Sequence, residues 1–278
     1  PLLTNIEQQL EHLEQAGITA KVLSAPPAAL LPPGQPLSPT MVERINDRFA
    51  ELVATYPQRL LALATIDAFQ GERAAREVVR AVETLGLGGI CVDCAQGDLW
   101  LDAPEARPSF EAAAALDVPV FVHPVSPVGL TERLTRLGHS GILLARGTED
   151  AASLLALLRS DLFATLPDLK LVLPMIGAAV FLFAGIADQE YGREEGWHGP
   201  QPGLTRTRLY VDTMGFDLAS IRFAIELLGP EQVLLGSDWP IMPIMQPQKV
   251  EEILTTLGLN EDQQTMILNG NAERLLRH

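Results

Sequence analysis

Short runs of apolar residues alternate along the chain with stretches in which apolar positions recur every three or four residues. The runs are continuous and contain many β-branched residues, which is typical of strands buried on both faces of a parallel sheet. They fall at residues 18–24, 60–66, 89–93, 118–123, 169–173, 209–212 and 232–237. The stretches with helical spacing fall at residues 4–16, 39–55, 72–85, 103–116, 126–137, 149–164, 177–190, 217–228, 248–257 and 261–269.

This regular alternation of strand and helix predicts βαβ units and a parallel α/β sheet. A length of 278 residues fits either one barrel or two smaller domains. No shift in composition and no linker marks a boundary, so we expect one domain over residues 1–278. The pattern contains seven strands where a closed (β/α)8 TIM barrel has eight, and its first element is a helix. The first barrel strand is therefore expected to be absent from this chain.

The charge balance narrows the range of partners. Twenty Lys and Arg against 35 Asp and Glu give a net charge of −15, which speaks against binding to nucleic acid or to an anionic membrane surface. The uncharged stretches at residues 22–42 and 171–187 are interrupted by proline or glycine, so we expect no membrane span. A small molecule is the expected partner.

The two cysteines, Cys91 and Cys94, are too few for a disulfide scaffold and fit a reducing, cytoplasmic location. Their spacing is that of a redox or zinc motif, but they lie in a predicted strand, where residues three apart face opposite sides. No second pair completes a zinc site. We expect buried, inert thiols.

Polar residues follow the predicted strands at their carboxyl ends, where parallel barrels carry their active sites. These positions are Ser24, Asp67, Asp93, His123, Asp212 and Asp238. Each has a structural alternative, because an aspartate after a strand often caps the next helix or forms a turn. Taken together, however, one histidine and several carboxylates on one rim suit a divalent metal and a general base acting on bound water.

Two segments carry a family resemblance. Phe-Val-His-Pro at residues 121–124, followed by Gly-Ser-Asp-Trp-Pro at 236–240, resembles the amidohydrolase-related family. The likeness is to its branch of aminocarboxymuconate-semialdehyde decarboxylase and resorcylate-type decarboxylases. Segments 16–24, 167–173 and 270–276 follow the family's order, so the resemblance runs from end to end of the chain.

The resemblance implies a distorted (β/α)8 barrel with one divalent metal, bound by an HxH pair on strand one, a histidine ending strand five and an aspartate ending strand eight. The last two match His123 and Asp238 in this sequence. The implied ion is zinc, with manganese as the second choice. Asp238 would also shuttle a proton, and Trp239, Asp212 and Met175 would contact the substrate. Family members often form homodimers.

Other positions depart from that pattern. The sequence contains no HxH, Met175 stands where the family has a histidine after strand six, and residues 185–186 lack the arginine that binds a substrate carboxylate in the aminocarboxymuconate enzyme. Three explanations stay open. An upstream segment supplies the missing ligands, the metal site has lost half of them, or the scaffold serves metal-free catalysis or binding. The first is favoured, because an absent barrel strand would expose two sheet edges.

The main prediction is therefore a metal-dependent hydrolase or carboxy-lyase acting on a small carboxylated or cyclic substrate. The alternative is a family member with a degenerate metal site that serves metal-free catalysis or non-catalytic binding of a ligand or partner. The proline-rich loop 26–39 is expected to cover the pocket. The loop at residues 192–200, with His198, is a candidate lid, and Met242 and Met245 are candidates for an apolar wall.

Overall fold

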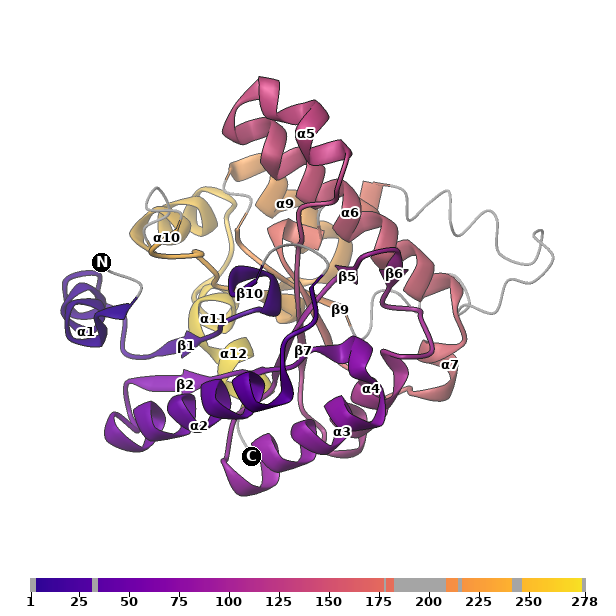
Figure 1. The fold of residues 1–278 in the computed structure, drawn as a ribbon. Coiled ribbons are helices and arrows are strands. Elements are labelled where there is room, and N and C mark those ends of the chain that lie inside the picture. Colours follow the sequence, from indigo (N-terminus) through magenta and orange to yellow (C-terminus); the bar gives the residue numbers. More distant parts are fainter. Residues whose placement is uncertain are drawn as a thin grey trace.

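The computed structural model describes residues 4–31, 35–177, 179–182, 209–214, 217–241 and 247–276. Its centre is a parallel sheet of six strands in the order β10-β9-β8-β7-β4-β3 (Figure 1). In chain order the strands are β1 (Lys21–Leu23), β2 (Leu60–Ala62), β3 (Ala64–Thr65), β4 (Ile90–Asp93), β5 (Ala95–Gln96), β6 (Leu99–Trp100), β7 (Val120–His123), β8 (Leu171–Leu173), β9 (Leu209–Asp212) and β10 (Val233–Leu234). Each of the seven predicted runs contains at least one strand.

β1 extends this sheet through a parallel pair with β2. Only Leu63 separates β2 from β3, and its N–H donates to the carbonyl of Leu23 at 2.9 Å. Within the described residues, β1 and β10 are not paired with each other. The segment after β10 contacts β1 through a side chain instead: Nζ of Lys21, the first residue of β1, donates to the carbonyl of Trp239 at 3.2 Å.

Helices surround the sheet (Figure 1). They are α1 (Ile6–Gln15), α2 (Pro39–Thr55), α3 (Glu72–Val79), α4 (Arg107–Ala115), α5 (Leu130–Leu134), α6 (His139–Arg159), α7 (Leu162–Thr165), α9 (Leu218–Leu228), α10 (Pro247–Thr256), α11 (Glu261–Thr265) and α12 (Asn271–Leu276). Side-chain caps fix several starts: Asn5, Ser38 and Asp217 each accept a hydrogen bond from the backbone of the helix that follows.

Apolar residues on the two faces of the sheet form two separate clusters. The larger lies between the strands and the helices and includes Val120, Val122 and Cys94. The smaller takes a residue from most of the strands and is completed by Leu275 and Leu276 of α12; its other buried members are Leu63, Cys91, Val172, Tyr210 and Leu234. Cys91 and Cys94 are thus buried, free and on opposite faces, as predicted.

The structure corrects two element predictions. α6 begins at His139, ten residues before the predicted helix at 149–164, and the antiparallel hairpin β5–β6 was not predicted. Gly141 explains the first error, because a glycine is unfavourable inside a helix and so argues against one in the sequence. In the structure this glycine packs directly on the carbonyl of Leu134, where no side chain fits. The predicted helix at 177–190 lies largely outside the described residues.

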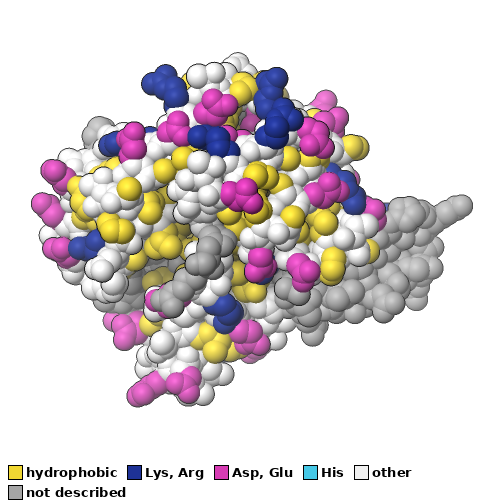
Figure 2. Space-filling model, turned by 90° about the horizontal axis from the view of Figure 1, so that it is seen from below, with side chains coloured by type: hydrophobic (Ala, Val, Ile, Leu, Met, Phe, Trp, Pro, Cys, Tyr) yellow, Lys and Arg dark blue, Asp and Glu magenta, His cyan; other side chains and the backbone are white. Residues whose placement is uncertain are grey.

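The surface carries mixed charges. On the face shown in Figure 2, acidic and basic side chains are interspersed with apolar ones rather than gathered into a single patch. No helix in the described ranges has the length and apolar character needed to cross a bilayer.

Candidate functional site

Three polar residues form a layer at the carboxyl end of the sheet. Side chains two residues apart on a strand share a face, so the inner apolar residues Cys91 and Tyr210 are followed on that face by Asp93 and Asp212. His123 follows Phe121 in the same way, and its Cα pairs with that of Asp93 across β4 and β7. These three residues therefore lie at the carboxyl ends of their strands, as the sequence predicted.

His123 is held at both ring nitrogens. Its Nδ1 lies 3.1 Å from Asp93 Oδ1, and its Nε2 lies 3.0 Å from Nη2 of Arg146. A guanidinium can only donate, so Nε2 accepts and Nδ1 carries the proton that is donated to Asp93. The orientation of the ring is thus set by a carboxylate on one side and a guanidinium on the other.

Asp93 also anchors the proline-rich loop. Its second oxygen, Oδ2, accepts the N–H of Ala28 at 2.7 Å. Burial raises the pKa of Asp93, while the contact with His123 and the Ala28 N–H act in the opposite direction. The capping role considered for Asp93 is not what the structure shows, because its carboxylate joins this loop to His123.

Asp67 has a similar role on the neighbouring strand. Its carboxylate makes no capping bond to the short helical turn that follows. It accepts instead from the N–H of Leu37 at 3.0 Å and from the side-chain amides of Gln70 and Gln96 at 2.8 and 2.9 Å. Asp67 therefore fixes the far end of the loop that Asp93 holds at Ala28.

Arg146 is a site residue that the sequence did not reveal. It lies on α6, and its Nε and Nη2 donate to the carbonyl of Pro124 at 3.2 and 2.9 Å while Nη2 also reaches His123. The only available signal was a basic residue between two glycines, in a segment that was not assigned to a helix.

Asp212 binds backbone rather than side chains. It accepts the N–H of Met214 at 3.1 Å and hydrogen bonds from the backbone of Met175 and Ile176. Met175 and Ile176 have φ values of 52° and 55°, which place them in the left-handed region and turn their N–H groups toward this carboxylate. Burial, the largest influence, raises the pKa of Asp212 to about 7.

Asp238 follows β10 at the same rim, also with a positive φ of 51°. Such strained positions gather at functional sites, where the surrounding structure holds them. Desolvation raises the pKa of Asp238, and the charges of Arg146 and Lys21, with that of His123 when its ring is protonated, oppose this rise. Asp238 thus lies within electrostatic reach of His123, although no direct bond joins the two.

Trp239 packs toward the start of the chain. Its ring stacks on His12 with centroids 4.0 Å apart, and Lys21 Nζ lies 4.8 Å from the ring centroid. Burial lowers the pKa of Lys21 to about 8, against the opposing influence of Asp238. The predicted substrate contacts of Trp239, Asp212 and Met175 stay predictions. His198, Met242 and Met245 lie outside the described residues.

The fit of a metal ion can be judged from the donors. His123 has the arrangement of a metal ligand, because its Nδ1–H is donated to a carboxylate. Its Nε2 lone pair, however, meets Arg146 rather than an open position. Within the described ranges no three His, Cys, Asp or Glu residues lie together in a group that could hold an ion. The described residues therefore do not fit a complete metal site.

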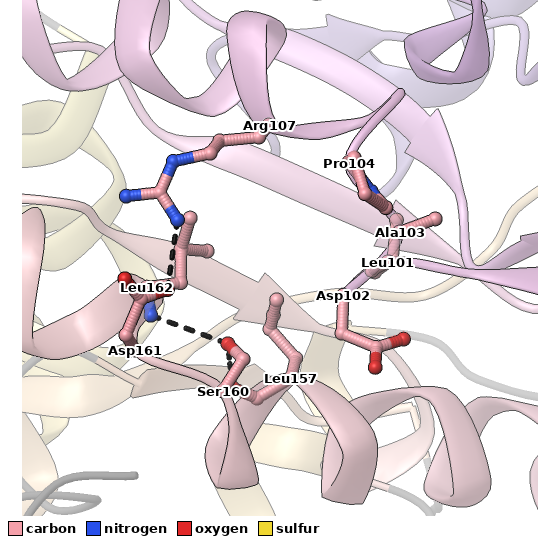
Figure 3. A pocket seen from close by; sticks show the side chains of 9 residues that line it. All are labelled: Leu101, Asp102, Ala103, Pro104, Arg107, Leu157, Ser160, Asp161 and Leu162. Carbon is pink, nitrogen blue, oxygen red and sulfur yellow. Dashed lines mark hydrogen bonds and ion pairs between the residues drawn. The ribbon is translucent and has the colours of Figure 1, made fainter. Parts of the chain in front are cut away.

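A separate cavity of about 230 Å³ lies away from this rim (Figure 3). It is lined by the segment before α4 and by the turn between α6 and α7. Its arginine is already paired, since Arg107 binds Asp161 at 2.8 Å and also Glu111 at 2.8 Å. None of the predicted site residues lines it, so we place the candidate site at the rim.

The fold and this rim define a parallel α/β-barrel protein with its polar site at the carboxyl ends of the strands. The amidohydrolase family model matches residues 18–278. The chain belongs to the amidohydrolase family.

Three relatives illustrate the likeness. The gamma-resorcylate decarboxylase of Polaromonas is 28% identical over 99% of this chain and 88% of its own length. The 2-amino-3-carboxymuconate-6-semialdehyde decarboxylase of Dictyostelium discoideum is 25% identical over 96% of this chain and 75% of its own. The crystal structure of a dihydroxybenzoic acid decarboxylase from Polaromonas, with bound manganese and 2-nitroresorcinol, has a TM-score of 0.82 and 26% identity, covering 98% and 85% of the two chains.

These comparisons confirm the family and the barrel class predicted from residues 121–124 and 236–240. They also support the predicted enzyme of the hydrolase or carboxy-lyase type, because relatives that match nearly the whole chain are decarboxylases. The alternative of a member that only binds a ligand or partner is not favoured.

Proposed function

We propose that this protein is a carboxy-lyase that removes CO2 from a small hydroxylated aromatic carboxylate. The observation that carries the proposal is similarity over 99% of the chain to a gamma-resorcylate decarboxylase. The rim supports it, because a histidine, three carboxylates and a guanidinium converge there on the inner face and at the ends of the strands. Decarboxylation is favoured over hydrolysis because this relative is a decarboxylase.

Asp238 is the residue that we assign to proton transfer. Removal of CO2 from an aromatic ring breaks the bond between the ring carbon and the carboxylate, and that carbon must gain a proton in exchange. A carboxylic acid at the open end of the barrel can deliver this proton and recover it from water. Asp93 sets the orientation of the His123 ring at the same rim.

We propose a divalent metal ion as the cofactor without assigning its ligands. The dihydroxybenzoic acid decarboxylase contains manganese, so manganese comes before zinc as the first ion to test. Because the described residues do not fit a complete metal site, we route no step through an ion. Small aromatic acids are the proposed substrates. A homodimer and a cytoplasmic location stay predictions.

The test is release of CO2 from 2,6-dihydroxybenzoate by the purified protein, with manganese, with zinc and with a chelator. Asp238→Asn should lower turnover by about 10²- to 10⁴-fold, the usual contribution of a general acid. Asp98→Asn, an exposed aspartate of the β5–β6 turn, is the matched control and should change nothing. A folded protein that releases no CO2 from hydroxybenzoates under any of these conditions would contradict the proposal.

A further inference from the structure

Arg146 is a half-buried cation without a carboxylate of its own. Two other partly buried arginines contrast with it: Arg80 binds Asp47 and Glu77, and Arg107 binds Glu111 and Asp161. Across the described ranges, no aspartate or glutamate lies within ion-pair distance of Arg146. A partly buried charge without an opposite charge is unfavourable, so this position favours an anion from outside.

The guanidinium is also fixed in place. Two hydrogen bonds to the carbonyl of Pro124 and one to His123 Nε2 hold the Nε–Nη2 side. Nη1 has no hydrogen-bond partner in the part of the chain that the structure describes. A guanidinium that is anchored on one side and open on the other is prepared to bind a carboxylate with little loss of side-chain freedom.

Its anchors place Arg146 in the candidate site. His123 is the last residue of β7 and Pro124 follows it, so the guanidinium lies at the carboxyl end of the sheet. Arg146 is close enough to Asp238 to influence its protonation, as is Lys21. Two basic side chains therefore act on the position to which we assign proton transfer.

We propose that Arg146 binds the carboxylate of the aromatic acid and so selects for it. This inference rests on the proposed function, which names the class of acid, but it concerns binding rather than turnover. Arginine is suited to the task because its open Nη1 can donate a charge-assisted hydrogen bond to a carboxylate oxygen while the other nitrogens stay anchored. The same arrangement occupies the lone pair of His123 Nε2, so Arg146 in this position and a cation on Nε2 exclude each other.

The test compares an acid with its neutral counterpart. Affinities for 2,6-dihydroxybenzoate and 2,6-dihydroxybenzamide are measured by stopped-flow fluorescence, before turnover, in the wild type and in Arg146→Gln. The variant should bind the acid about 10- to 100-fold more weakly, as expected for a hydrogen bond to a charged group. Its affinity for the amide should stay the same. Arg146→Lys keeps the charge but loses the anchored, planar guanidinium, so the loss should be smaller.

Arg107→Gln is the matched control, because Arg107 is an arginine on the separate cavity and should not affect either ligand. Equal loss for acid and amide, no loss for either, or a wild type that does not bind the acid would overturn the inference. If Arg146→Gln does not fold, Arg146→Lys decides by the same criterion.

The outcome is separable from that of the proposed function. Binding of the acid through Arg146 without any release of CO2 would contradict the decarboxylase assignment but support this inference. Release of CO2 with a KM that Arg146→Gln does not change would support the decarboxylase assignment but contradict this inference.

Discussion

Gly236 and Asp212 lie so close that no side chain fits between them. A Cβ atom on Gly236 would be 2.6 Å from Cβ of Asp212 and 3.0 Å from its Oδ2. Gly236 also exchanges two hydrogen bonds with Thr213, whose Oγ1 lies 3.0 Å from the glycine carbonyl oxygen and 3.2 Å from its nitrogen. The absence of a side chain at Gly236 thus lets Asp212 reach the strained turn at Met175 and Ile176.

Gly236→Ala should therefore disturb the site as well as the fold. The added methyl must displace Asp212, so we expect a loss of about 1–3 kcal/mol in the free energy of unfolding, typical of overpacking. Turnover should fall further than stability alone explains. Denaturant unfolding and kcat measure the two effects. Gly270→Ala is the control, since its nearest neighbour is 3.8 Å away. If both alanine variants behave alike, the contact with Asp212 is not limiting.

Asp93→Ala should uncouple His123 from its orientation. The substitution removes the acceptor of the Nδ1 proton and the partner of the Ala28 N–H together. Loss of a carboxylate that orients a functional histidine typically lowers activity by about 10- to 100-fold. We expect that decrease in kcat, with a change in the ¹⁵N chemical shifts of the His123 ring. Unchanged ring shifts would show that Arg146 alone holds the imidazole.

Sequence reasoning identified the parallel strands and four positions of the rim for a clear physical reason. Continuous apolar runs mark buried parallel strands, and a polar residue at the end of such a run marks the rim, as at Asp93, His123, Asp212 and Asp238. Arg146 could not be found in this way, because its partners are a ring nitrogen and a carbonyl brought near by folding. The role of Asp67 was missed for the same reason, since its bond to Gln96 spans 29 residues.

Asp67→Ala should loosen the proline-rich loop. The variant loses acceptors for one backbone N–H and two side-chain amides, of which the Leu37 N–H is buried. We expect a decrease of about 2–3 kcal/mol in the free energy of unfolding, because a buried donor left without a partner is costly. Hydrogen exchange should accelerate at Leu37 in particular. Asp98→Ala, on the exposed β5–β6 turn, should leave both quantities unchanged. Protection at Leu37 that survives the substitution would contradict this role.

Asp150 makes the stability of the fold depend on pH. It lies one turn after Arg146 on α6 and is fully buried, and its carboxylate meets only the weak donor of the Cys94 thiol rather than an N–H or O–H group. Burial, and secondarily the charge of Asp212, raises its pKa from 3.8 to about 8, while Arg146 acts in the opposite direction. The folded protein therefore keeps a proton on Asp150 at neutral pH that the unfolded chain releases.

The sign of the effect follows from that proton. Between pH 4 and pH 8 the folded state binds one proton more at this residue, so the free energy of unfolding should fall as the pH rises and level off above about pH 8. Asp150→Asn cannot titrate, so its dependence on pH should be flatter, and its stability relative to the wild type should improve from pH 5 to pH 8. Urea unfolding at four pH values measures both slopes, and Asp102→Asn, at an exposed position, should keep the wild-type slope. Equal slopes for the wild type and Asp150→Asn would mean that Asp150 stays ionised in the fold, in which case Arg146 would have to neutralise it and would be less available to an external carboxylate.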